Sequence, residues 1–132
     1  MIAGIGVDII EIDRINKSIE RNPNFINKIF TENEIEYFKL RKMRPEYIAG
    51  RFAAKEAISK ALGTGIRGFD IKDIEIDRNA LGKPIAVLKG KCKKILKKYP
   101  NYKMHISISH SKENAIAYAL LEVDVDEDSK VL

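Results

Sequence analysis

The stretch RFAAKEAISKALGTGI, residues 51–66, decides the fold that we predict for this chain. Its composition is that of a single helix, which we expect to begin near Pro45 and to end at Gly63, because proline suits a first helical turn and glycine favours termination. At about 100° per residue, Glu56 lies on the same side as small and apolar side chains. The pattern therefore predicts a core helix that carries one carboxylate on its buried side.

That carboxylate is costly to bury without a partner, by several kcal/mol at least, in the order of magnitude measured for buried charges. We therefore expect a cation beside Glu56. Lys60 lies one helical turn further along on the same side. It either forms an ion pair with Glu56, worth about a few tenths of a kcal/mol, or faces a ligand that both residues bind.

A strand is predicted at the start of the chain, where apolar residues alternate with small or polar ones. The apolar positions are Ile5, Val7 and Ile9, and the others are Gly4, Gly6 and Asp8. This period of two is typical of a strand with one apolar face. Asp8 should therefore point away from the isoleucines.

A basic stripe follows on the next predicted helix. Isoleucines at positions 12, 15 and 19 have helical spacing, and the opposite side carries Arg14, Lys17 and Arg21. This stripe is either a docking surface for an acidic partner or merely a solvated helix face.

The remaining predicted elements are short. Thr31 and Glu34 form a capping box that opens a helix over roughly residues 32–42. After the helix of Glu56 we expect strands at 71–77 and 85–88, a lysine-rich helix ending before Pro100, and a hairpin of residues 104–109 and 115–123. No internal repeat or linker appears, so we predict an α+β fold: a single compact domain, residues 1–123, with a small antiparallel sheet packed on one long buried helix.

Composition limits the class of protein. The chain has 132 residues, of which 45% are hydrophobic and 33% charged, as expected for one soluble domain. It starts without a basic leader and contains no run of the ~20 apolar residues that a membrane span needs, so we expect a cytoplasmic protein. The single cysteine, Cys92, can form neither an internal disulfide nor, without a second thiol, a zinc site.

Charge is distributed unevenly along the chain. The net charge is +5, but the tail at residues 124–132 has four acidic residues against Lys130, which gives the tail −3 and leaves +8 on the rest. We expect the acidic tail to be disordered. The basic body favours an acidic partner, which can be a nucleic acid, a phosphorylated metabolite or an acidic protein.

Both histidines lie in the segment HISISHS, residues 105–111. If the strand continued to His110, that residue would join the isoleucines of the segment. We expect the strand to end at Ser109 and to leave His110 free at its terminus, where functional side chains gather. For His105 a structural and a functional role both stay open.

Four segments occur together, in this order and spacing, in one known family. They are GIGVDIIEIDRI at 4–15, GRFAAKEAISKALGTGI at 50–66, GKP at 82–84 and HISISHS at 105–111. The chain resembles the holo-acyl-carrier-protein synthases, the short, trimeric type of 4′-phosphopantetheinyl transferase, everywhere except in its tail. The resemblance implies the 4′-phosphopantetheinyl transferase fold and a Mg²⁺-dependent transfer of 4′-phosphopantetheine. The group would move from coenzyme A to a serine of apo acyl carrier protein, giving holo acyl carrier protein and adenosine 3′,5′-bisphosphate.

The resemblance implies that Asp8, Glu56 and Lys60 are catalytic. Asp8 and Glu56 would hold Mg²⁺, which proteins usually bind through one or two carboxylates together with phosphates and waters. Either Glu56 or a metal-bound water polarised by Asp8 would activate the serine. Lys60 would stabilise or protonate the leaving group.

Coenzyme A contacts are implied at six further positions: Arg51, Gly63, Gly65, Lys83, Pro84 and His110. His110 would contact the 3′-phosphate, to which Arg51 can add a bidentate grip. The two glycines would let the backbone approach the nucleotide, although helix termination alone also explains Gly63. Lys83 and Pro84 would lie near the adenine.

The family also implies a homotrimer with active sites at subunit interfaces, and a carrier protein docked on the stripe of Arg14, Lys17 and Arg21. One alternative is a basic nucleic-acid-binding module, but the aromatic residues do not interleave with the basic ones. Another is a metal-dependent phosphohydrolase, which would use water in place of serine. We expect binding to neither nucleic acid nor membrane.

Overall fold

The computed structural model describes residues 1–63 and 69–124. Its elements, in chain order, are β1 (Ile2–Glu11), α1 (Ile12–Arg21), α2 (Phe25–Ile29), α3 (Glu32–Leu40), α4 (Pro45–Ala61), the 3₁₀ turn η1 (Ile71–Asp73), β2 (Ile74–Arg78), β3 (Pro84–Leu88), α5 (Gly90–Ile95), β4 (Lys103–His110) and β5 (Asn114–Glu122). The predicted α+β architecture is confirmed.

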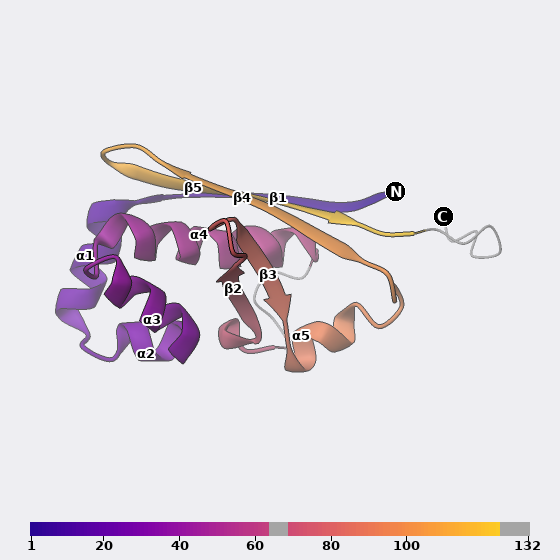
Figure 1. Ribbon diagram of the computed structural model, residues 1–132, viewed down its shortest axis with the longest axis horizontal. Coiled ribbons are helices and arrows are strands. Elements are labelled where there is room, and N and C mark those ends of the chain that lie inside the picture. The colour runs from indigo at the N-terminus through magenta and orange to yellow at the C-terminus, as the bar shows by residue number, and fades with distance from the viewer. Residues whose placement is uncertain (64–68, 125–132) are drawn as a thin grey trace.

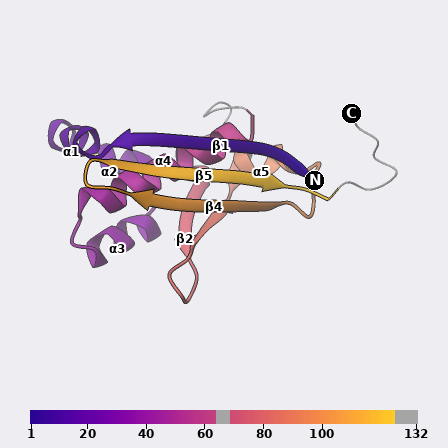
Figure 2. The same ribbon diagram turned by 90° about the horizontal axis from the view of Figure 1, so that it is seen from above.

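An antiparallel sheet of three strands, in the order β1-β5-β4, covers one side of α4 (Figure 1). Beneath α4, helices α1 to α3 lie at one end of the molecule, and the β2–β3 hairpin with α5 lies at the other (Figure 1). Figure 2 shows β5 running between β1 and β4, so β1 and β4 form opposite edges of the sheet. Helix α4 is thus covered on both sides, as predicted for a core helix.

Both predicted ends of α4 are confirmed. Pro45 occupies the first turn, and Gly63 follows the C-terminal cap with a φ of 79°, in the left-handed region that favours glycine. The predicted capping box of α3 is also present, because the Thr31 side chain accepts from the Glu34 N–H and the Glu34 carboxylate accepts from the Thr31 N–H.

Strand β1 packs on α4 through its glycine face. A Cβ added at Gly4 would lie 1.8 Å from the carbonyl oxygen of Ala61, and one added at Gly6 would lie 1.9 Å from that of Ala57. Strand and helix therefore meet backbone to backbone, which only glycine allows. Asp8 is the next residue on this face, so the close approach carries it toward α4.

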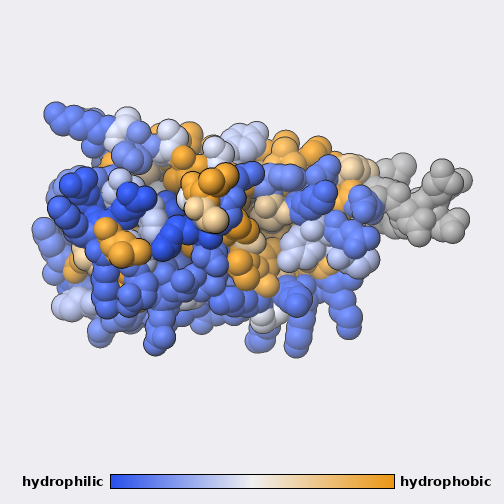
Figure 3. Space-filling model, viewed as in Figure 1, coloured by the Kyte–Doolittle hydropathy of each residue, from blue (hydrophilic) through white to orange (hydrophobic). Residues whose placement is uncertain are grey.

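The alternate face of β1 is exposed. Ile5, Val7 and Ile9 retain 54%, 46% and 64% of their accessible surface, and Ile116 and Tyr118 of β5 are exposed beside them. Asp8 points away from these isoleucines, as predicted. The sheet therefore presents an apolar face to solvent in the single chain. On the side face seen in Figure 3, the end formed by α1 to α3 is mostly hydrophilic, and hydrophobic residues gather toward the sheet and the hairpin.

Some predicted boundaries were wrong. Strand β4 includes His110, so this residue joins the side of Ile106 and Ile108 rather than standing free beyond the strand. Residues 71–73 form a 3₁₀ turn before β2, and α3 ends at Leu40. Gly65 and all of the predicted tail except Asp124 lie outside the described residues. In the described part of the chain, no helix is both long and apolar enough to cross a membrane.

Candidate active site

Asp8 and Glu56 meet at one pocket, and Lys60 bonds to Asp8. Lys60 Nζ donates to Asp8 Oδ1 at 3.1 Å and to the Val7 carbonyl oxygen at 2.9 Å, which ties α4 to β1. Asp8 and Glu56 both line a pocket of about 370 Å³. Among the ion pairs of the described residues, Lys60 therefore pairs with Asp8 and not with Glu56.

Glu56 is only half-buried, at the wall of this pocket, and so is less enclosed than the sequence suggested. Burial raises the pKa of its carboxyl, the negative charge of Asp8 raises it further, and Lys60 opposes both effects. The two carboxylates thus repel each other across the pocket. A bound cation would relieve that repulsion.

The donor set fits magnesium. The described residues contain no group of three or more His, Cys, Asp or Glu side chains placed to hold a metal ion. Mg²⁺ does not need such a cage, because it commonly takes one or two carboxylates and fills the remaining positions with phosphate oxygens and waters. Asp8 and Glu56 supply that minimal pair.

The rest of the pocket has an apolar wall that was not predicted from the sequence. The rings of Phe25 and Phe52 lie 6.3 Å apart, and Ile10 and Ile15 complete the wall. Phe52 is one of the apolar side chains that helical spacing places on the side of Glu56, and Phe25 lies in a five-residue helix too short for a periodic signal.

The basic stripe borders this pocket. Arg14, Lys17 and Arg21 line a neighbouring hollow of about 440 Å³, and Arg14 lines the pocket of Asp8 and Glu56 as well. Lys17 forms an ion pair with Asp13 at 2.9 Å, which raises the pKa of the lysine, so part of the positive charge is compensated. Through Arg14, the stripe on α1 therefore reaches the pocket of the two carboxylates.

A second cluster lies elsewhere, around Tyr37. The guanidinium carbons of Arg51, Arg78 and Arg41 lie 4.1, 4.7 and 5.5 Å from the centre of the Tyr37 ring. None of the three arginines makes an ion pair with a carboxylate among the described residues. Such a concentration of cations is suited to an anion. Of the three arginines, the sequence indicated Arg51 only.

Arg51 is the most enclosed member of this cluster. Its side chain is 8% exposed, and its Nε is buried with no hydrogen-bond partner among the described residues. Burial lowers the pKa of its guanidinium, and Arg78 and Arg41 lower it further. His110 extends the cluster, since its ring lies 5.9 Å from that of Tyr47, over which Arg41 also lies at 5.3 Å.

The other predicted contacts occupy turns. Lys83 and Pro84 end the β2–β3 turn, where the Asn79 side chain accepts the Lys83 N–H at 2.9 Å. The Lys83 side chain is exposed. Gly63 has open space around it, and its structural role is the helix termination described above.

One chain does not bring all the predicted residues together. Asp8 lies on β1, at one edge of the sheet, whereas His110 lies on β4, at the other, and the β2–β3 turn projects on the β4 side (Figure 2). Arg51 and Glu56 are five positions apart on α4, and therefore about 140° apart around the helix. The carboxylate pocket and the arginine cluster thus face different sides of the molecule.

Comparison with known proteins identifies the class. The family model of the 4′-phosphopantetheinyl transferase superfamily matches residues 4–119. A holo-acyl-carrier-protein synthase of Clostridium novyi is 68% identical over 94% of this chain and 90% of its own length, and one of Clostridium kluyveri is 64% identical over 98% and 96%. A crystal structure of the Bacillus anthracis synthase in complex with CoA (3′,5′-ADP) has 44% identity and a TM-score of 0.78, covering 94% of this chain and 99% of that one.

The chain therefore belongs to the 4′-phosphopantetheinyl transferase superfamily, and within it to the holo-acyl-carrier-protein synthases. It is an enzyme of the transferase class.

Proposed function

We propose that this enzyme transfers 4′-phosphopantetheine from coenzyme A to a serine of apo acyl carrier protein with the help of Mg²⁺, releasing adenosine 3′,5′-bisphosphate. The observation that carries this proposal is that Asp8 and Glu56 line one pocket while Lys60 bonds to Asp8. The Clostridium novyi relative is named a holo-acyl-carrier-protein synthase, and the crystal structure of the Bacillus anthracis synthase is a complex with CoA (3′,5′-ADP).

Asp8, Glu56 and Lys60 have separate roles in the reaction. Asp8 and Glu56 hold Mg²⁺, which when bound neutralises the negative charge of the pyrophosphate. The Lys60 ammonium group, beside Asp8, donates to the leaving phosphate as the bond to phosphopantetheine breaks. The proton of the attacking serine passes to Glu56 or to a water near Asp8.

The stripe of Arg14, Lys17 and Arg21 docks the carrier protein. Because Arg14 lines both the stripe and the carboxylate pocket, a carrier held on α1 presents its serine near Glu56. Acyl carrier proteins are acidic, so opposite charges also accelerate the encounter.

The arginine cluster binds the far end of coenzyme A. Arg51 and His110 take the 3′-phosphate, and Arg41 and Arg78 add positive charge there. Lys83 and Pro84 lie near the adenine, and Gly63 and Gly65 let the backbone approach the nucleotide.

We further propose a homotrimer. The carboxylate pocket and the arginine cluster face different sides of one chain, so a coenzyme A that needs both must lie between two copies. The exposed apolar face of β1 and β5 supplies a surface for such an association. Residues 1–123 form the transferase domain, residues 124–132 are an acidic tail, and the protein acts in the cytoplasm.

The test is the mass of the carrier protein. Apo acyl carrier protein incubated with the enzyme, coenzyme A and Mg²⁺ should gain the mass of one phosphopantetheine group. A phosphohydrolase would cleave coenzyme A without changing the carrier, and a nucleic-acid-binding module would do neither. An unchanged carrier mass would contradict the proposal.

A further inference from the structure

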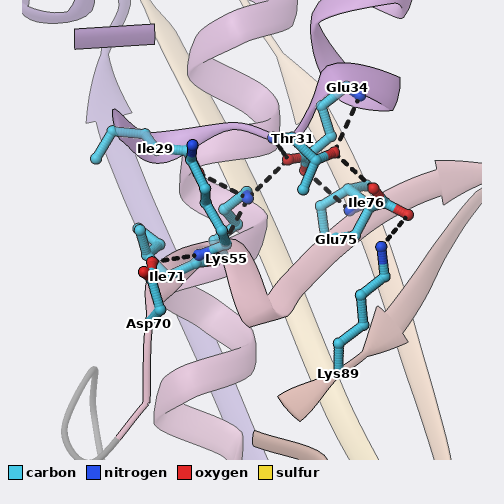
Figure 4. A network of polar contacts seen from close by, with 10 residues as sticks. Ile29, Thr31, Glu34, Lys55, Asp70, Ile71, Glu75, Ile76 and Lys89 are labelled. Carbon is cyan, nitrogen blue, oxygen red and sulfur yellow. Dashed lines mark hydrogen bonds and ion pairs between the residues drawn. The ribbon is translucent and has the colours of Figure 1, made fainter. Parts of the chain in front are cut away.

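A fully buried ion pair lies on the side of α4 that faces α3 and β2. Lys55 Nζ and Glu34 Oε1 are 2.8 Å apart, and both side chains are 0% exposed. Figure 4 shows the pair at the centre of a network of polar contacts. The mechanism proposed above gives neither residue a part.

Lys55 is held by three separate segments. Its Nζ donates to the carbonyl oxygens of Ile29, before α3, at 2.9 Å and of Ile71, in η1, at 3.4 Å, in addition to pairing with Glu34 of α3. These oxygens use all three donors of the ammonium group. The position of the Lys55 side chain, and with it that part of α4, is therefore fixed in three directions.

Glu34 is equally constrained. Its two oxygens accept the backbone N–H of Thr31 at 2.8 Å and that of Ile76, in β2, at 2.9 Å. The Thr31 hydroxyl donates to Glu75, which pairs with Lys89 at 3.0 Å and so extends the network to the surface (Figure 4). The network links α3, β2 and α4, elements that are distant in sequence.

Stability alone does not account for such a pair. Replacing a buried ion pair by apolar side chains of similar volume is often neutral or even stabilising, because burying two charges is costly. Apolar contacts are not directional, however, so they constrain the rotation and axial position of a helix less strictly than hydrogen bonds and ion pairs do. Directional contacts to three segments fix both.

The rotation and axial position of α4 determine where the carboxylate of Glu56 lies. Lys55 directly precedes Glu56, about 100° away around α4. On the other side of α4, Gly4 and Gly6 bring the helix against β1, and Lys60 bonds to Asp8 and to the Val7 carbonyl oxygen. The buried pair therefore constrains the axial position of α4 from the opposite side. A shift of α4 along β1 would move Glu56 and Lys60 together relative to Asp8.

We infer that Lys55 and Glu34 are positioning residues for the transfer reaction: their buried pair fixes the rotation and axial position of α4, so that Glu56 and Lys60 face Asp8. This inference rests on the proposed function, because it needs the assignment of those three residues to the site. Neither Lys55 nor Glu34 touches substrate or metal.

The test compares Lys55→Met, Glu34→Gln and the double variant in kcat, in KM for each substrate and in thermal unfolding. Lys55→Met leaves a carboxylate buried without its partner, so it should unfold at a lower temperature, and the double variant should recover most of that loss. In the folded double variant we expect kcat to stay about ten-fold or more below wild type, since a 1 Å misplacement of a reacting group costs about 100-fold. KM for the carrier protein should stay near wild type, because the stripe lies on α1.

The exposed pair Lys39 and Glu36 of α3, 3.4 Å apart, provides the matched control. Lys39→Met/Glu36→Gln should change neither kcat nor the unfolding temperature.

A folded Lys55→Met/Glu34→Gln variant with wild-type kcat would overturn the inference. If the double variant does not fold, Glu34→Gln decides instead, because it keeps the volume of the side chain but removes the charge that faces Lys55 and one of the two acceptor oxygens. It should fold with a lower kcat, and a wild-type kcat would overturn the inference. Failure of the site assignment itself would appear separately, as full activity in Glu56→Gln.

Discussion

Two glutamates of this protein occupy opposite environments. Glu34 is fully buried, but its charge is matched by Lys55 and its oxygens accept two backbone N–H groups. Glu56 is half-buried and faces a second carboxylate, Asp8, across an open pocket. A satisfied carboxylate stabilises one geometry, whereas an unsatisfied one at a pocket is suited to binding a cation.

The raised pKa of Glu56 predicts a loss of activity on the acid side. On the proposed function a proton on Glu56 would remove a metal ligand, and burial together with Asp8 raises the pKa of this carboxyl above that of an exposed glutamate. Mg²⁺ favours the ionised form, so the midpoint of this loss in kcat/KM should move to lower pH as Mg²⁺ is raised. A midpoint independent of Mg²⁺ would count against Glu56 as a ligand.

His110 should matter only for the 3′-phosphate. We expect His110→Ala to raise KM for coenzyme A about ten-fold, the effect of losing one hydrogen bond to a charged group. KM for dephospho-coenzyme A, which lacks that phosphate, should stay unchanged. An equal rise for both substrates would show that His110 acts elsewhere.

Sequence reasoning located single residues well where local geometry decides, and poorly where distant segments meet. The capping box showed that Glu34 turns back to Thr31, but its pairing with Lys55 depends on how α3 packs on α4. Arg41 and Arg78 were missed for the same reason, since only the folded chain brings both against Tyr37.

At the scale of elements, α1 carries the prediction for the carrier protein. Arg14→Glu/Arg21→Glu should raise KM for the carrier about ten-fold or more, because attraction becomes repulsion, and should leave KM for coenzyme A nearly unchanged. Lys93→Glu/Lys94→Glu on α5, also exposed but outside the stripe, is the matched control. An equal rise of KM for the carrier protein and for coenzyme A in the stripe variant would contradict the docking proposal.

The period of an element was predictable, but the face that it buries was less so. Alternation predicted β1 and the direction of Asp8 relative to the isoleucines. It did not show that the glycine face packs on α4, because that contact depends on the small residues Ala57 and Ala61 of a distant helix. The end of β4 was misplaced because its pairing with β5 continues to His110 and Ala115.

At the scale of the whole molecule, the exposed face of β1 and β5 predicts assembly. The wild-type protein should have a mass in solution of three times the 15.0 kDa of one chain. Ile5→Glu should dissociate it and abolish transfer, because a charge cannot be buried cheaply at an apolar contact and one copy lacks a complete coenzyme A site. Leu40→Glu, at another exposed apolar residue, should remain trimeric. A fully active single-chain wild type, measured by light scattering, would contradict the trimer.

The overall architecture was predictable because one buried helix and three alternating strands leave few ways to form a core. The division of the site between two sides of the chain was not, since sequence order does not show which edge of a sheet a strand occupies.

The central claim is that Glu56 and Asp8 hold the cation that makes phosphopantetheine transfer possible. Its most direct test is the rate at which apo acyl carrier protein gains mass with Glu56→Gln, which keeps the volume of the side chain and removes its charge. We expect a folded variant whose transfer rate at saturating Mg²⁺ is lower by about 100-fold or more, the scale of losing a metal ligand or a proton acceptor. A folded Glu56→Gln variant that modifies the carrier at the wild-type rate would contradict it.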